Sequence, residues 1–197
     1  MAFEIKKFSL PEVPGISAKT LEEHIKLYEG YVKNANLIEE KIKGYKETGE
    51  DSYAISELQR RFAFEFNGMR NHEYYFEQLE GGKSELSSES LLVKQIEKDF
   101  GSLEAWLESF KNLCLTRGIG WAILWFDKRT EKLVQGWVDE QHLGHLGGLE
   151  FIYGIDMWEH SYLFDYIPAE KKKYVESYLA TTNQKVSEER FQKALGA

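Results

Sequence analysis

This chain has 197 residues, enough for one large domain or for two small domains that share a core. Its content of 42% hydrophobic and 29% charged residues is ordinary for a soluble globular protein. The formal net charge of -8, with the lysines scattered rather than aligned, excludes a basic nucleic-acid-binding surface, so we expect no nucleic-acid partner.

The N-terminal stretch MAFEIKKFSLPEVPG contains no apolar segment long enough for export or membrane insertion. We therefore expect a cytoplasmic protein with no membrane partner. The single cysteine, Cys114, excludes an intramolecular disulfide and lies in an apolar helical pattern, where it is expected to fill the core.

The first eighty or so residues are predicted to form an antiparallel helical hairpin. Ser17 is placed to cap a long first helix, AKTLEEHIKLYEGYVKNANLIEEKIKGY, whose apolar residues recur at helical spacing. A turn is expected over residues 44–51, which contain two glycines.

The second helix of the hairpin has two possible starts. Ser56 and Gln59 form a plausible capping box, but the helix could also begin earlier, near Ser52. It is predicted to end near Gly81-Gly82.

The rest of the chain mixes helices and strands. A linker over residues 81–90 is followed by predicted helices at about 89–100 and 102–117, and a last helix is predicted at about 168–181. Between them WAILWFD, KLVQGWVDE and LEFIYGIDM are rich in β-branched and aromatic residues, and DKRTE is a turn between the first two. The fold class is thus α+β, with a helical-hairpin domain over 1–85 and a domain over 86–197 that contains a three-stranded antiparallel sheet.

Two histidines of the hairpin are predicted to point inward. His72 continues the apolar stripe of the second helix, and His24 lies on the first helix on the same face as Tyr31. Taken alone, either is more often a core histidine bonded to a carbonyl. The aromatic segment DMWEHSYLFDY adds Asp156 and His160, and three imidazoles with one carboxylate suit a first-row transition metal such as iron, manganese or zinc.

Other metal sites are less favoured by the sequence. The absence of a thiolate makes a structural zinc site less favoured than a catalytic site with an open position. No histidine follows a glutamate at the Glu-x-x-His spacing of di-iron bundles. His142 and His145 could form a second metal pair, but they lie in a glycine-containing loop and we rank this interpretation low.

The segments ISAKTLEEH, FNGMRNHEYYFEQL, GIGWAILW and DMWEHSY resemble the iron/manganese superoxide dismutase family, over nearly the whole chain. The resemblance implies a metal between the two domains, bound by His24, His72, Asp156, His160 and a water or hydroxide. It implies one manganese or iron ion per subunit and conversion of superoxide to oxygen and hydrogen peroxide through trivalent and divalent metal states.

The resemblance also assigns residues around the ligands. Tyr31 matches a tyrosine that orders water and assists proton delivery. A glycine at Gly68 with a glutamine at Gln141 resembles the manganese type, so manganese is slightly preferred, although a loop shift of one residue would substitute His142 for Gln141. Glu159 matches a glutamate that bonds the ligand His160 of the other subunit, which implies a homodimer.

Aromatic residues are expected to wall the site. The resemblance places three tryptophans there, although simple core packing is an alternative for Trp125; the three are Trp121, Trp125 and Trp158.

Three features depart from the family. The spacing from His24 to Tyr31 is one residue shorter than usual, and Leu27 or Tyr28 stands where a histidine is usual. Leu163 replaces the tyrosine that partners that histidine across the dimer. Because both members of this pair are missing, a non-catalytic metal-binding relative remains the alternative function, and a zinc hydrolase ranks last because it lacks a suitable general base.

Overall fold

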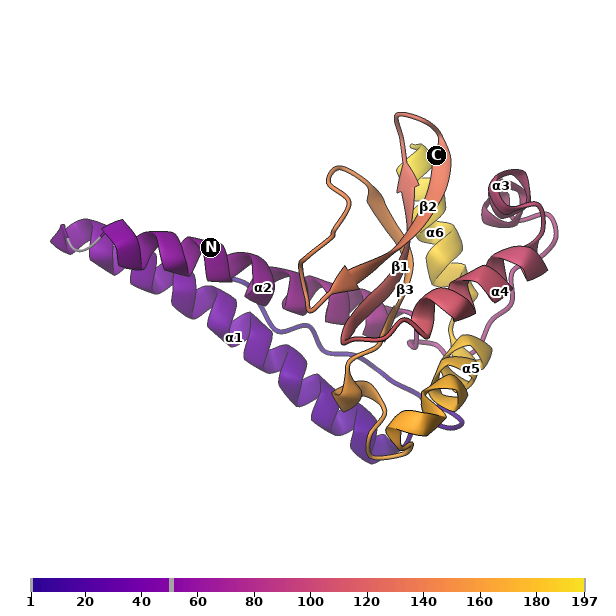
Figure 1. Ribbon diagram of the computed structural model, residues 1–197, viewed down its shortest axis with the longest axis horizontal. Coiled ribbons are helices and arrows are strands. Elements are labelled where there is room, and N and C mark those ends of the chain that lie inside the picture. Colours follow the sequence, from indigo (N-terminus) through magenta and orange to yellow (C-terminus); the bar gives the residue numbers. More distant parts are fainter. Residues whose placement is uncertain (1, 50–51, 197) are drawn as a thin grey trace.

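The computed structural model describes residues 2–49 and 52–196, which form a long helical hairpin and a half that contains a sheet (Figure 1). Helices α1 (Ala18–Thr48) and α2 (Ser52–Glu77) are antiparallel, and their connected ends project away from the rest of the molecule. The α+β fold class is therefore confirmed.

Glycine ends the first helix later than predicted. Ser17 caps α1 as expected, since its hydroxyl accepts the backbone N–H of Thr20 at 3.2 Å. The turn predicted from residue 44 is wrong in its first part, because α1 runs through Gly44 and ends at Gly49, whose φ is 72°. One interior glycine costs a helix only about 1 kcal/mol, which a long helix tolerates; residues 50–51 of that turn lie outside the described part.

The second helix begins at the earlier of its two predicted starts. Ser56 lies inside α2, where its hydroxyl donates to the carbonyl of Tyr53 at 2.8 Å, so the Ser56–Gln59 capping box is not formed. Near the other end α2 stops at Glu77, a few residues before the glycine pair. Its C-terminal half is the buried half and carries His72.

Two short helices follow the linker. Helix α3 spans Leu91–Phe100 and α4 spans Leu103–Cys114, the latter capped by Ser102 as a serine at this position predicts. Cys114 is buried, in agreement with its predicted place in the core, and burial raises the pKa of its thiol.

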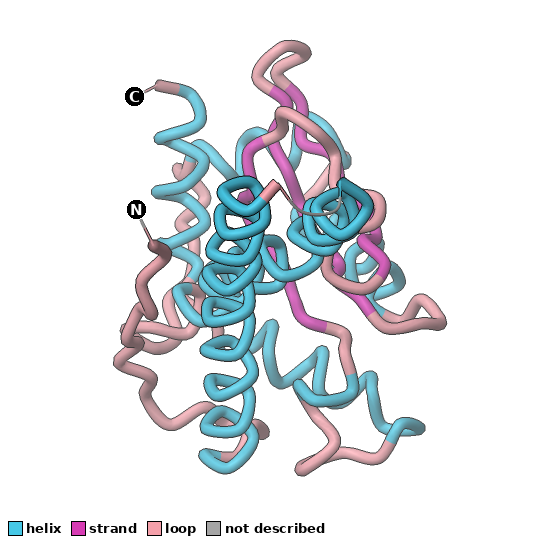
Figure 2. Tube along the Cα trace, turned by 90° about the vertical axis from the view of Figure 1, so that its left-hand side faces the viewer, coloured by secondary structure: helices cyan, strands magenta, loops and turns pink. Residues whose placement is uncertain are grey.

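The sheet has the order β2-β1-β3 with both pairs antiparallel, as predicted. Strand β1 (Gly120–Asp127) is the central strand and is buried along almost its whole length, which explains its continuous apolar sequence. Strands β2 (Lys132–Asp139) and β3 (Glu150–Asp156) flank it. Figure 2 shows the molecule from the outer end of the hairpin, where α1 and α2 are connected. In this view the strands lie behind these two helices.

Short 3₁₀ turns connect the sheet to the last helices. Turn η1 (Glu159–Ser161) follows β3 directly, and η2 (Pro168–Glu170) leads into α5 (Lys171–Thr181). The helix predicted from residue 168 is therefore 3₁₀ in its first turn, where Pro168 lacks a backbone N–H.

A final helix, α6 (Gln184–Leu195), was not predicted. Its mean hydropathy is low, and its buried residues Ser187, Phe191 and Ala194 form a narrow stripe at helical spacing. That stripe packs toward β3 and α3, and the ring of Phe191 lies 5.0 Å from that of Phe126.

One core joins the two halves. Met69, Tyr75 and Phe76 of α2 belong to the same buried cluster as Trp121 and Ile155 of the sheet. The described helices include none that is long and apolar enough to span a membrane.

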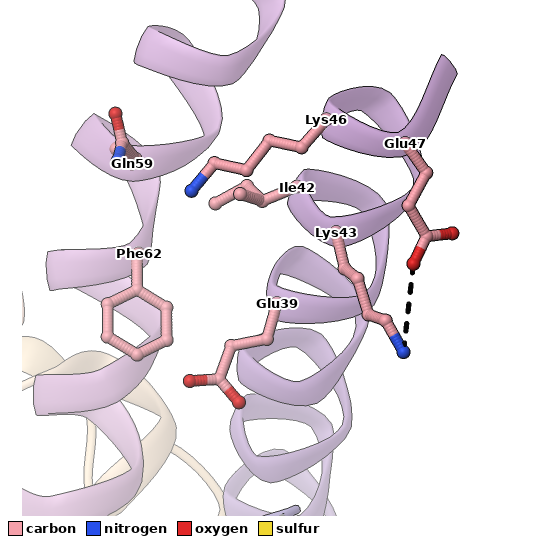
Figure 3. A pocket seen from close by; sticks show the side chains of 7 residues that line it. All are labelled: Glu39, Ile42, Lys43, Lys46, Glu47, Gln59 and Phe62. Carbon is pink, nitrogen blue, oxygen red and sulfur yellow. Dashed lines mark ion pairs between the residues drawn. The ribbon is translucent and has the colours of Figure 1, made fainter. Parts of the chain in front are cut away.

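The outer end of the hairpin has a groove between its two helices, about 600 Å³ in volume (Figure 3). Both charge signs are present in it, and Lys43 and Glu47 of α1 approach to 3.9 Å. The residues that line the groove are Glu39, Ile42, Lys43, Lys46, Glu47, Gln59 and Phe62.

Replacing Phe191 by alanine should destabilise the fold, because this buried ring attaches α6 to the sheet. We expect a loss of about 3–5 kcal/mol in the free energy of unfolding, the usual cost of removing a buried phenylalanine. Urea unfolding of variant and parent at equal metal content measures it. Leu195→Ala, at an exposed position of the same helix, is the matched control and should change little; an equal effect of both variants would contradict the predicted packing.

Candidate metal centre

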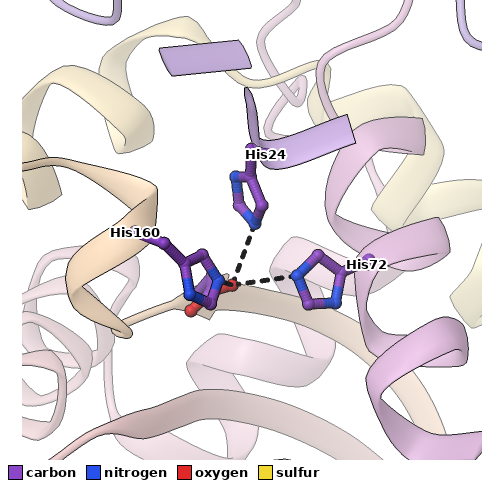
Figure 4. Close-up of side chains that lie close together, drawn as sticks. His24, His72 and His160 are labelled. Carbon is purple, nitrogen blue, oxygen red and sulfur yellow. Dashed lines mark hydrogen bonds and ion pairs between the residues drawn. The ribbon is translucent and has the colours of Figure 1, made fainter. Parts of the chain in front are cut away.

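Four side chains that are far apart in the sequence meet between the hairpin and the sheet. His24 comes from α1, His72 from α2, Asp156 from the end of β3 and His160 from η1. One donor atom of each lies within 4.8 Å of the others. In Figure 4 the three imidazoles point toward one another, around the oxygen atoms of the carboxylate.

The three imidazoles converge on one carboxylate oxygen. Nε2 of His24 lies 3.0 Å from Oδ2 of Asp156, Nε2 of His160 lies 3.1 Å from it, and Nε2 of His72 lies 3.5 Å from it. The other oxygen, Oδ1, accepts the backbone N–H of Trp158 at 2.7 Å. The carboxylate is therefore held by its own loop, and one oxygen remains for the centre.

His72 presents a free lone pair to this oxygen. Its Nδ1 hydrogen bonds to the carbonyl of Gly68 at 2.5 Å, and because a carbonyl only accepts, this nitrogen carries the proton. Nε2 is then an acceptor, is buried, and has no hydrogen-bond partner among the described residues. Two acceptors that face each other in the interior require a cation between them, so the donor set fits a metal ion.

Burial sets the protonation states of the centre. The side chains of His24, His72 and Asp156 are fully buried, and burial lowers the pKa of both histidines. Burial alone would raise the pKa of Asp156, but the charge of His160 and the hydrogen bonds from His160 and His24 outweigh it and hold that pKa well below its usual value. Neutral His24 and His72 with an ionised Asp156 are in the form that binds a metal.

A chain of hydrogen bonds borders the centre. Trp121 donates its indole N–H to Oε1 of Gln141 at 2.9 Å, and Nε2 of Gln141 donates to the hydroxyl of Tyr31 at 3.0 Å. The ring of Tyr31 lies 5.1 Å from that of His72. Burial raises the pKa of Tyr31, so its hydroxyl stays protonated.

Gly68 provides the space that this chain occupies. A Cβ atom at this position would lie 2.5 Å from Cδ1 of Tyr31. A side chain at this position of α2 would therefore displace the tyrosine ring, and the amide that donates to the Tyr31 hydroxyl comes from Gln141 in the loop after β2.

The loop places Gln141, and not His142, beside Tyr31. Glu140 has a positive φ of 51°, unusual for a residue other than glycine, and its carbonyl accepts the indole N–H of Trp158 at 3.0 Å. The fully buried Gln141 side chain then faces inward, while the ring of His142 packs 5.6 Å from that of Phe64.

Asn71 lies beside the centre and was not predicted from the sequence. Its side-chain amide donates to the backbone carbonyl of Gln141 at 3.1 Å and lies 3.2 Å from Nε2 of His145. It thus ties the loop to the helix that carries His72. Its position directly before this histidine was the only signal in the sequence.

The predicted tryptophans divide into two groups. Trp121 lies 5.1 Å from the ring of His72, and Trp158 stacks on His160 at 5.6 Å, so both border the centre. Trp125 is four residues further along β1, about 13 Å away at the rise of a strand. It packs near Gly136 and His145 instead, as the core-packing alternative described.

The residues expected at a subunit contact lie on the surface of the single chain. Glu159 is exposed, and its carboxylate forms no hydrogen bond or ion pair within the described part of the chain. Leu27 and Leu163 are 40% and 45% exposed. Tyr28, the other candidate for the missing histidine's position, is buried and accepts the backbone N–H of Lys6 at 2.8 Å.

Both halves of the chain match known protein families. Residues 11–80 match the model for the alpha-hairpin domain of iron/manganese superoxide dismutases, and residues 88–190 match the model for their C-terminal domain. An iron superoxide dismutase of Aquifex aeolicus is 34% identical over 190 residues, which cover 93% of this chain and 87% of that protein.

Manganese proteins are similar at the same level. A mitochondrial manganese superoxide dismutase of Glossina morsitans morsitans is 31% identical over 199 residues, covering 95% of this chain and 90% of that protein. A manganese superoxide dismutase of Haloferax volcanii is 35% identical over 159 residues, covering 79% of this chain and 77% of that protein. The similarity therefore leaves the choice of metal open.

Replacing His72 by alanine should abolish metal binding, because the change removes one of the four converging donors. Metal analysis by mass spectrometry, on protein loaded with manganese or iron, checks this. Tyr31→Phe is the matched control and should keep a full metal content, since the tyrosine belongs to the hydrogen-bonded chain around the donors. Stoichiometric metal in the His72→Ala protein would contradict the assignment.

Proposed function

Because this chain belongs to the iron/manganese superoxide dismutase family, we propose that it converts superoxide to oxygen and hydrogen peroxide at one manganese or iron ion per subunit, with manganese slightly preferred. The observation that carries the proposal is the buried group of His24, His72, Asp156 and His160. These four residues are the proposed ligands. Two superoxide anions and two protons give one molecule each of oxygen and hydrogen peroxide.

The reaction requires both electron and proton transfer. A manganese or iron ion in this group supplies one-electron redox chemistry between its trivalent and divalent states. The protein supplies a fixed donor set of one negative charge, from Asp156, and a dry environment in which that charge acts strongly.

Gln141 and Tyr31 are the proposed catalytic residues beyond the ligands. The Gln141 amide donates one N–H to the Tyr31 hydroxyl and has a second N–H for a group bound at the centre. Tyr31 accepts from the amide and keeps its own proton, since its pKa is raised by burial. Its hydroxyl hydrogen is therefore available for the reduced product, and bulk water replaces it.

The proposed preference for manganese comes from the origin of the amide. Gly68 offers no side-chain amide at its position on α2, and Gln141 reaches the Tyr31 hydroxyl from the loop after β2. This combination resembles the manganese type. Similar proteins named for iron and for manganese both exist, so the preference rests on this arrangement alone.

We further propose a homodimer through contacts of Glu159 with the other subunit's copy of His160. Glu159 is exposed, and no described residue pairs with its carboxylate, so it is free for such a contact. Leu163 and Phe164, which follow η1, are 45% and 52% exposed and would extend the contact with apolar area.

Two further proposals come from the sequence. The domains are taken as 1–85 and 86–197 with the metal between them, and the location as cytoplasmic. One similar protein is named as mitochondrial, so similarity alone does not fix the compartment.

Superoxide turnover by separately manganese-loaded and iron-loaded protein, normalised to bound metal, tests the function. We expect the manganese form to be the more active, because the combination of Gly68 and Gln141 resembles the manganese type. Comparable rates would indicate a metal-tolerant enzyme and contradict the preference. Full metal content without turnover in either form would favour the non-catalytic metal-binding alternative.

Replacing Glu159 by alanine should weaken the dimer, because it removes the charge that would pair with the other subunit. Sedimentation velocity over a range of protein concentrations measures the change. Glu40→Ala removes an equally exposed glutamate from α1 and should leave the association unchanged. A monomeric parent protein, or an unaffected dimer in the Glu159→Ala protein, would overturn this assignment.

A further inference from the structure

A cavity that opens to the surface lies on the opposite face of the sheet from the metal centre. Its volume is about 350 Å³, and Leu124 of β1 and Tyr153 of β3 form its floor. Each is three residues from a side chain of the centre, Trp121 or Asp156, and alternate residues of a strand face opposite sides. The linker before α3 and helices α3, α4, α5 and α6 complete the walls, whose apolar residues include Leu86, Leu92, Ile96, Leu103, Leu107 and Leu179.

Two buried hydrogen-bond donors in this cavity lack partners. Trp106 and Ser187 both line it and are 3% and 1% exposed. Within the described residues neither Nε1 of Trp106 nor Oγ of Ser187 has a hydrogen-bond partner. Proteins satisfy more than nine in ten of their buried polar groups, so two such groups in one cavity indicate an acceptor held inside it.

The remaining polar groups show that this acceptor is uncharged. At the mouth Lys83 and Glu85 pair with each other at 2.8 Å. Inside, the hydroxyl of Thr182 is bonded to Tyr153 at 3.2 Å and to Gln184 at 3.0 Å. No cavity-lining charge among the described residues is left to neutralise an ion, and an ion without a partner is costly in an apolar space.

We propose that this cavity binds an uncharged small molecule with an apolar body and one carbonyl or hydroxyl oxygen, which accepts hydrogen bonds from Trp106 and Ser187. Its volume is in the range of small-molecule sites. The site is separate from the metal centre and does not depend on the reaction there.

Calorimetric titration of the metal-loaded protein with 1-indanone and with indane tests the proposal. The two probes share one bicyclic skeleton and differ in a carbonyl group. We expect saturable binding of one indanone per chain, and binding of indane that is weaker by about tenfold to hundredfold, the value of the two net hydrogen bonds that indane cannot form. Absence of indanone binding up to its solubility limit, or equal binding of both probes, would overturn the proposal.

Two substitutions of one residue locate the bound molecule. Ser187→Ala removes only the hydroxyl and should weaken indanone binding by about threefold to tenfold. Ser187→Leu fills the space and should abolish binding. Ser109→Ala makes the same change on the exposed surface of α4 and should leave binding unchanged, and turnover of superoxide should be normal in all three. Unaltered indanone affinity in the Ser187→Leu protein would place the ligand elsewhere and refute the site.

Discussion

Oδ2 of Asp156 is the atom on which the arrangement of this molecule depends. The carboxylate is fully buried at the end of β3, and a buried charge is costly unless other groups compensate it. Compensation comes from His24 of the hairpin and from His160 of η1, whose Nε2 atoms lie 3.0 Å and 3.1 Å from this oxygen. The hairpin must therefore pack on the sheet for the charge of Asp156 to be tolerated. The centre assembles only when the two halves are in contact.

Gly68 connects the donor atoms to the groups around them. Its carbonyl fixes the proton of His72 on Nδ1, which turns the lone pair of Nε2 toward Asp156. The absence of a side chain at Gly68 leaves room for Tyr31, whose hydroxyl accepts a hydrogen bond from the amide of Gln141. A single residue without a side chain thus acts on both a ligand and the proton donor, which explains why the amide comes from a loop more than seventy residues away.

The sequence allowed the donors to be predicted more accurately than their surroundings. His24 and His72 lie on apolar stripes, and a helical period fixes the face on which a residue lies. Whether Gln141 or His142 lies beside Tyr31 depends on the backbone of Glu140. No sequence pattern predicts the positive φ of this residue. Helix α6 was not predicted because its narrow stripe of buried residues lies within a polar sequence.

The positions of the donor atoms also determine how metal binding affects the stability of the fold. Without a cation, the lone pair of His72 and the carboxylate of Asp156 repel each other at 3.5 Å in the interior, where the dielectric constant is low. A bound cation turns the same contact into an attraction that spans α2 and β3. Because the unfolded chain has no such arrangement of donors, the free energy of metal binding adds to the stability of the native state. The packing of Met69, Tyr75 and Phe76 against the sheet stabilises the contact between the two halves independently of the ion.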